Sequence, residues 1–186
     1  PAARKLDKIT YEEMLEMASL GAKVLQTRSV EMAMKHRVRV QVLSSFTDQP
    51  GTLVCDEEEI VEQELVSGVA YSRDEAKVTL VGVQDQPGVA AGIFGPLADA
   101  NINVDMIVQN ASSDGTTDIT FTTGRGELER AVKVVKENMK VPHRGISTDK
   151  NVAKVSVIGV GMRSHAGVAQ TMFKALADKG INIHII

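Results

Sequence analysis

The chain has 186 residues, 43% of them hydrophobic, 3% aromatic and none tryptophan, and its formal net charge is −3. This is enough for one or two domains with a buried core. The weakly acidic charge and scarce aromatics exclude the basic stacking surface of a nucleic-acid binder, and no apolar run approaches the ~20 residues of a membrane span. The start has no apolar signal core, and the single cysteine, Cys55, excludes an internal disulfide. These features predict a cytoplasmic protein.

Two helices are predicted near the amino terminus. Thr10 and Glu13 have capping-box spacing and precede an apolar helical face that ends near Leu20. A second helical pattern runs from about Ala22 to His36.

Two short strands and a boundary follow. Valines alternate with polar residues from Val38 to Val42, which predicts a half-buried strand. A turn at 48–51 leads into an extended segment, Thr52 to Val54. The acidic stretch Asp56–Glu59 predicts a solvated boundary.

Beyond this boundary the pattern predicts a βαββα order with a last strand near Gly145 to Ser147. The expected elements are strands around 66–70 and 77–83, a helix over 88–100, a strand over 102–108, a hairpin turn at 112–115, a returning strand around Ile119 and Phe121, and a helix over 128–139. This order is that of a ferredoxin-like module, an antiparallel sheet with helices on one face.

The chain contains part of this module twice. The segment Lys77–Val83 returns as Lys154–Val160, and nine identities between Gly88 and Asn103 return at a constant offset of 79 residues (Gly88 to Gly167). A repeat of this length indicates two copies of one unit. The second copy is expected to supply a strand over 154–160, a helix over 166–179 and a strand over 181–186.

These patterns predict an α+β fold of tandem ferredoxin-like βαββαβ modules. The expected domains are 1–62, 63–150 and 151–186, with the second module truncated at its end. Because the chain stops within an apolar strand pattern, we expect it to be a piece of a longer protein.

The strongest candidate site is Asp85-Gln86-Pro87-Gly88-Val89, between a strand and a helix. Gly88 allows a close approach to the backbone, and the first amides of the following helix suit a carboxylate. Asp85 could hold an ammonium group, so a small amino acid fits the pair. The alternative is a simple turn in which Asp85 caps the helix. The same four letters at Asp48–Gly51 lead into a strand and have no helix dipole.

Polar residues on the strand after that helix form a second candidate. Asn103, Asp105 and Gln109 occupy positions of the same parity on a strand expected to be central, with Asn110 beside them. They would face solvent in an isolated module and could line a pocket in a paired one. Asn182 repeats Asn103, which favours the pocket.

Other motifs carry no chemistry. Gly159-Val160-Gly161 resembles the start of a dinucleotide-binding fingerprint, but Ser164 occupies the position of its third glycine. The acidic residue expected about 20 residues further on is also missing. Ser164 could cap the following helix, and His165 is interpreted as a loop residue. Cys55 beside four acids would have little thiolate character. The histidines have no metal-ligand spacing.

The chain resembles the carboxyl-terminal part of aspartate kinase over essentially its whole length. Three groups of segments carry the resemblance: Arg4–Glu16 and Leu20–Leu25 for the tail of the kinase domain; Asp85–Val89, Asn103–Asp105, Gln109–Asn110 and Gly115–Phe121 for a first ACT module; Lys154–Gly161, Ser164–His165, Gly167–Val168 and Ile181–Ile183 for a second.

The resemblance implies a parent enzyme that phosphorylates aspartate with ATP and Mg, while this segment lacks the catalytic core and needs no cofactor of its own. It implies feedback inhibition by L-lysine, L-threonine or both, bound between ACT modules that pair across a homodimer and act on the kinase domain of the same protein. It also implies insertion of the first module into the second. The effector contacts that it implies are Asp85, Gly88, Val89, Ala90, Asn103, Val104, Asp105, Gln109 and Asn110, with Gly167, Val168, Ala169, Asn182 and Ile183 in the second module.

There are two alternatives to a regulatory segment of aspartate kinase. A free-standing ACT-type amino-acid-binding protein would have no kinase attached, and the sequence upstream of Pro1 would distinguish it. A ferredoxin-like module that binds RNA would need stacking aromatics where the predicted sheet has Thr, Ile and Val.

Overall fold

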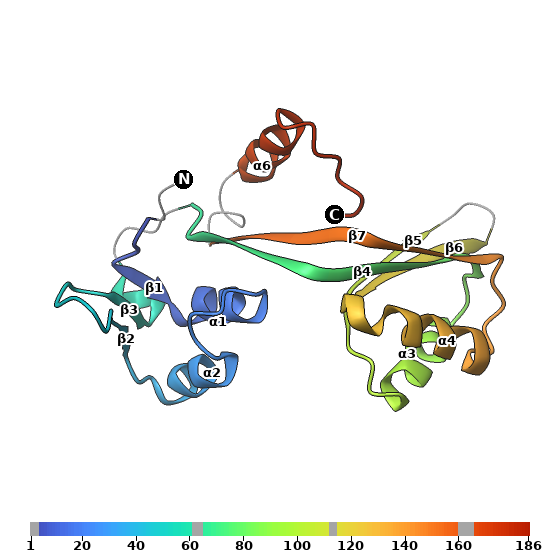
Figure 1. Cartoon of the computed structure of the whole chain (residues 1–186), viewed down its shortest axis with the longest axis horizontal. Helices are drawn as coiled ribbons and strands as arrows, with labels where there is room; N and C mark the ends of the chain where they lie inside the picture. The colour runs from blue at the N-terminus through green and yellow to red at the C-terminus, as the bar shows by residue number, and fades with distance from the viewer. Residues whose placement is uncertain (1–3, 61–64, 112–114, 160–165) are drawn as a thin grey trace. The chain divides into compact units, whose positions relative to one another are not determined.

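The structure is a computed structural model that describes residues 4–60, 65–111, 115–159 and 166–186 (Figure 1). Apart from the last two residues, it divides into two compact units: unit 1 comprises Pro1–Tyr71 and Val155–His184, and unit 2 comprises Ser72–Lys154. These two units are defined by contacts within each unit and do not test the expected domain limits at residues 62 and 150, which stay predictions.

The amino-terminal part of unit 1 is a small sheet with two helices. The sheet order is β1-β3-β2, with β1 parallel and β2 antiparallel to β3. The elements are β1 (Lys8–Thr10), α1 (Tyr11–Ser19), α2 (Thr27–His36), β2 (Val40–Val42), β3 (Thr52–Cys55) and the 3-10 turn η1 (Glu57–Glu59). The buried core residues are Ile9, Tyr11, Met14, Val30, Ala33 and Val54.

The start of α1 confirms the capping-box prediction. The Glu13 amide donates to Thr10 Oγ1 at 3.1 Å, and the Thr10 amide donates to Glu13 Oε2 at 3.2 Å. The prediction for α2 was too long, because Gln26 has an extended backbone and is the N-cap, so the helix begins at Thr27. The acidic boundary is exposed at Glu57 and Glu58.

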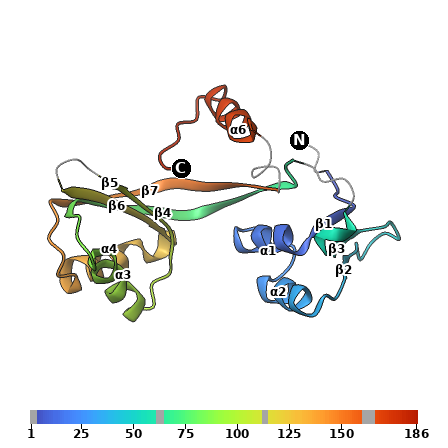
Figure 2. The ribbon, with the colours of Figure 1, turned by 180° about the vertical axis from the view of Figure 1, so that it is seen from behind.

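Unit 2 is a four-stranded sheet with two helices on one face. Its elements are β4 (Gly68–Gln84), α3 (Val89–Asp99), β5 (Val104–Ala111), β6 (Thr116–Thr123), the 3-10 turn η2 (Arg125–Glu127), α4 (Leu128–Asn138) and β7 (Gly145–Ile158), with the outer ends of β4 and β7 assigned to unit 1. The strand order β5-β6-β4-β7 confirms the ferredoxin-like fold. In Figures 1 and 2, α3 and α4 lie on the same side of the sheet. We call this side the proximal face and the opposite side the distal face.

The core of unit 2 lies between the helices and the proximal face. It contains Val78 and Leu80 of β4, Ile93 and Leu97 of α3, and Phe121 of β6, all 0% exposed, together with Ile119, Ala131 and Val135. The rings of Phe94 and Phe121 meet edge to face, with their centroids 5.6 Å apart. The inner face predicted for α3 is confirmed at Val89, Ile93 and Leu97 and wrong at Ala98, which is exposed.

Three strand predictions were wrong. The strands expected at 66–70 and 77–83 are one strand, β4, because its polar middle stays extended and Glu75 is buried there. Those expected at 145–147 and 154–160 likewise form one strand, β7, which ends at Ile158. The strand that begins after α3 is not central, since β5 lies at the edge of the described sheet. The hairpin turn that joins β5 to β6 falls largely outside the described residues.

In the second copy the predicted helix is present and the predicted last strand is not. Its helix, α6 (Val168–Ala177), is present. Residues 181–186 do not form the expected strand, because within the described part of the chain no strand pairs with them. The Ile181 amide instead donates to the Leu176 carbonyl at 3.0 Å, which closes the end of the helix.

Candidate functional site

Helix α3 begins at a glycine in the left-handed conformation. Gly88 has φ 91° and ψ −8°, and as the N-cap residue it has no side chain that could cap the helix. The simple turn with Asp85 as a cap stays an alternative interpretation. The Val89 amide donates to the Gln86 carbonyl at 3.3 Å, and the Gly92 amide donates to the Gly88 carbonyl at 2.9 Å. The Ala90 and Ala91 amides lie between them in the first helical turn, where backbone N–H groups carry partial positive charge. Val89 is buried and Ala90 is exposed.

Asp85 is positioned by strand β5 and by Gly115, the residue directly before β6. Gln109 Nε2 of β5 donates to Asp85 Oδ1 at 3.3 Å, and the Asp85 amide donates to the Gly115 carbonyl at 3.0 Å. Both side chains are exposed. An exposed carboxylate next to the amino end of a helix can take the ammonium group of an amino acid, while the helix amides take its carboxylate.

A β-bulge in β5 separates residues that parity predicted to lie together. Val104 pairs with Thr123 and Ile107 with Phe121, so three steps on β5 match two on β6. Gln109 pairs with Ile119 and faces the same side as that core residue. Asp105 instead lies with Glu75, which alternation places on the face opposite to the buried Ala76. The expectation of one shared face is therefore wrong: Gln109 is on the proximal face and Asp105 is on the distal face.

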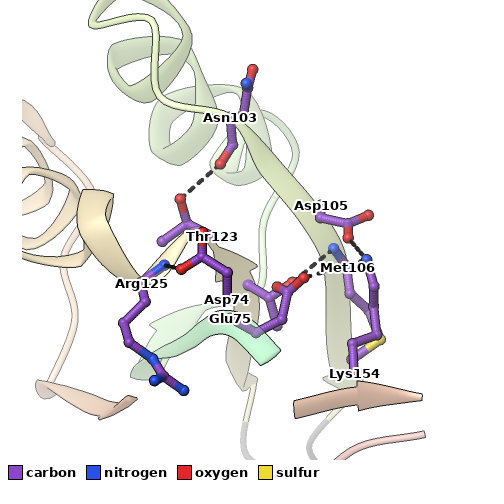
Figure 3. A network of polar contacts seen from close by, with 9 residues as sticks. Asp74, Glu75, Asn103, Asp105, Met106, Thr123, Arg125 and Lys154 are labelled. Carbon is purple, nitrogen blue, oxygen red and sulfur yellow. Dashed lines mark hydrogen bonds and ion pairs between the residues drawn. The ribbon is translucent and has the colours of Figure 1, made fainter. Parts of the chain in front are cut away.

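On the distal face, Asp105 is paired with a lysine of the chain itself (Figure 3). Lys154 Nζ of β7 contacts Asp105 Oδ2 and lies 3.6 Å from Glu75 Oε1 of β4. The Lys154 side chain is 16% exposed and that of Glu75 10%, while that of Asp105 is 53% exposed. We call Glu75, Asp105 and Lys154 the distal cluster. The Met106 amide donates to Thr122 Oγ1 at 3.1 Å and holds β5 beside this cluster.

Asn103 and Val104 border a hollow between α3 and the start of β5. Its volume is about 500 Å³, and its lining is Phe94, Ala98, Asn101, Ile102, Asn103, Val104 and Ile107. The Asn103 carbonyl accepts a hydrogen bond from Thr123 Oγ1 at 2.8 Å, and the Asn110 carbonyl accepts one from Thr117 Oγ1. The structure thus divides the predicted residues of the first module among the α3 start, this hollow and the distal cluster.

The start of α6 repeats the start of α3. Gly167 has φ 102° and ψ −10°, and the Thr171 amide donates to its carbonyl at 2.9 Å. Val168 and Ala169 are half-buried. Asn182 is exposed and Ile183 is half-buried. The predicted cap Ser164 and the loop residue His165 lie outside the described residues.

Sequence reasoning missed two members of the distal cluster, Glu75 and Lys154. In the sequence, Lys154 is distinguished only as the repeat equivalent of Lys77 and as the first residue of the segment Lys154–Gly161. The acidic pair Asp74-Glu75, directly before a strongly apolar segment, was a signal for a polar cluster. The residues that lie beside this pair depend on the order of the strands in the sheet.

Other chemistries find no support in the described part of the chain. Burial raises the pKa of the Cys55 thiol and the charge of Glu59 raises it further, which disfavours a nucleophilic thiolate. Among the described residues no three His, Cys, Asp or Glu side chains gather as a metal site would require. None of the described helices has the length and apolar character needed to cross a membrane.

The chain contains one ferredoxin-like unit and part of a second, and a left-handed glycine begins the first helix of each. The family model described as ACT domain matches residues 78–139 and 155–186, about half of the chain. The chain belongs to the ACT-domain family.

The proteins that it resembles within this family are aspartate kinases. The aspartate kinase of Pseudomonas putida is 57% identical over 188 residues, covering 100% of this chain and 46% of that protein. The ligand-free regulatory subunit of aspartate kinase from Thermus thermophilus is 35% identical, with TM-score 0.61, over 66% of this chain and 82% of that one. Aspartokinase III of E. coli in complex with lysine and aspartate is 28% identical, with TM-score 0.67, over 98% and 40%. The chain spans about half the length of the curated relatives it matches.

Proposed function

We propose that this chain is the effector-binding regulatory part of an aspartate kinase and that it binds L-lysine, L-threonine or both for feedback inhibition. The observation that carries the proposal is the start of α3. There a left-handed Gly88 precedes the first-turn amides of Ala90 and Ala91, and the Asp85 carboxylate accepts a hydrogen bond from Gln109. The amides and the carboxylate are complementary in charge to the two charged groups of an amino acid.

The repeat supports the proposal. Gly167 at the start of α6 has the same backbone conformation as Gly88, so the second module presents helix amides in the same way. The aspartokinase III complex cited above contains lysine, which is consistent with an effector of this class.

The catalytic part would lie in the remainder of the parent protein. There, ATP with Mg would phosphorylate the side-chain carboxylate of aspartate to give 4-phospho-L-aspartate. Inhibition then requires an effector that binds the inactive state of the kinase more tightly than the active state, and its strength equals that difference in affinity. A homodimer formed through the ACT modules is part of this proposal. Among the described strands β5 lies at the edge of the sheet and pairs only with β6, and its Ile107 is exposed, which supports the proposal.

Calorimetric titration with L-lysine and with L-threonine tests the proposal. We expect Asp85→Ala to weaken effector binding roughly tenfold or more, because a charged hydrogen-bond partner of the ammonium is lost. Asp48→Ala is the matched control, since the same Asp-Gln-Pro-Gly letters there lead into β3 and not into a helix. If a folded, dimeric parent protein binds neither amino acid, the effector site is refuted.

The kinase assignment is tested separately. The parent protein should transfer phosphate from ATP to L-aspartate, and the effector found by calorimetry should inhibit that reaction with Asp85→Ala relieving the inhibition. Effector binding without any aspartate phosphorylation would favour the free-standing amino-acid-binding protein.

A further inference from the structure

The distal cluster has the features of a built site for a primary ammonium group. Glu75 is 7% exposed, so its carboxylate is largely removed from water. A buried carboxylate requires a cation or several donors to offset its desolvation. The Lys154 ammonium, 3.6 Å away, supplies this charge.

The cluster is open on one side. The Asp105 side chain is 53% exposed, whereas those of Glu75 and Lys154 are 10% and 16% exposed. Asp105 is therefore the carboxylate of the cluster that is most accessible to an ammonium group from solvent, and Glu75 is the less accessible one. The cation now in place belongs to β7, while the two carboxylates belong to β4 and β5 (Figure 3).

We propose that Glu75 and Asp105 form an ammonium site, separate from the α3 site, which Lys154 fills as an internal ligand. A cationic ligand that uses Asp105 must displace Lys154, so Lys154 is a specificity-determining residue against ligands with a primary ammonium side chain. This inference goes beyond the proposed function and does not depend on it, because the bulge in β5 places Asp105 on the distal face and Gln109 beside Asp85.

Removal of the internal ligand should convert the cluster into a site for a free amine. In the full chain, Lys154→Met replaces lysine by another unbranched side chain and removes the ammonium charge. n-Butylammonium is the probe, because it reproduces the lysine side chain without an α-carboxylate. Loss of the covalent tether lowers the effective concentration of the cation, so we expect binding at about millimolar concentration.

The expected result is calorimetric binding of n-butylammonium to Lys154→Met that is roughly tenfold or more tighter than to the unsubstituted chain. The amine should also raise the thermal midpoint of this variant. Lys77→Met is the matched control, since Lys77 is the repeat equivalent of Lys154, on β4, and the same charge is removed. That control should bind the amine no better than the unsubstituted chain.

A double variant guards against a folding defect. Glu75→Gln combined with Lys154→Met removes both charges of the Glu75–Lys154 pair. This double variant should be more stable than Lys154→Met alone and should not bind the amine. The inference is overturned if folded Lys154→Met binds the amine no better than Lys77→Met, or if the double variant binds it equally well. Binding of L-lysine or L-threonine at the α3 site is measured separately with Asp85→Ala, so failure of the α3 site and failure of this site give different results.

Discussion

Helices α3 and α6 arise from the same repeated sequence and begin in the same way, yet their surroundings differ. Their N-cap glycines have φ 91° and 102°, and each glycine carbonyl accepts a 2.9 Å bond from the amide four residues on. Val89, Ile93 and Leu97 of α3 are buried, whereas none of the ten residues of α6 is buried. The repeat therefore specifies a helix and its first turn, while burial requires packing partners such as α4 and the proximal face.

The largest predicted difference between the copies concerns their inner faces. Ile93→Ala removes a side chain that is 0% exposed and should destabilise unit 2 by about 2–5 kcal/mol. Met172→Ala, at the equivalent position of α6, should cost much less because Met172 is only half-buried. Urea unfolding, with hydrogen exchange of the β6 amides as a local probe of unit 2, measures both. Equal costs would show that α6 is as well packed as α3.

The cap glycines should behave alike. Gly88→Ala and Gly167→Ala each place a β-carbon on a left-handed backbone, which costs roughly 1–2 kcal/mol. Neither β-carbon would meet a neighbour within 4 Å, so the cost is conformational in both cases. Helix content by circular dichroism and urea unfolding report it. A loss confined to one copy would break the equivalence of the two helix starts.

The aromatic position gives the smallest predicted loss of stability. Phe94→Leu keeps an apolar side chain and removes the edge-to-face contact with Phe121, at a cost of about 1 kcal/mol. Phe173→Leu in α6 should have little effect, since Phe173 is half-buried in a helix with no buried residue. The thermal midpoints of the two variants compare them directly. A larger loss from Phe173→Leu would mean that this ring has a tighter environment than Phe94.

Local signals in the sequence were sufficient for much of the fold. The capping box at Thr10 and Glu13, the helix after Gly88 and the alternation around Ile119 and Phe121 all depend on neighbours within a few residues, and the structure contains each of them. The repeat predicted α6 for the same reason.

Features that depend on a partner strand could not be predicted. The bulge in β5 exists only in its pairing with β6, and it moves Asp105 away from the face that parity assigns to it. The single strand β4 and the burial of Glu75 likewise depend on β7 and Lys154. The helix start was therefore predicted because its geometry is local, whereas the expectation of one polar face along the strand was wrong. The effector contacts themselves stay predictions.

The most direct test of the central claim is a titration of amide chemical shifts in the isotope-labelled parent protein. As L-lysine or L-threonine is added, the account predicts the largest shifts at the Ala90 and Ala91 amides, where the helix start receives the ligand carboxylate, and loss of these shifts in Asp85→Ala. Saturating binding that leaves both amides unshifted would contradict the assignment of the effector site to the start of α3.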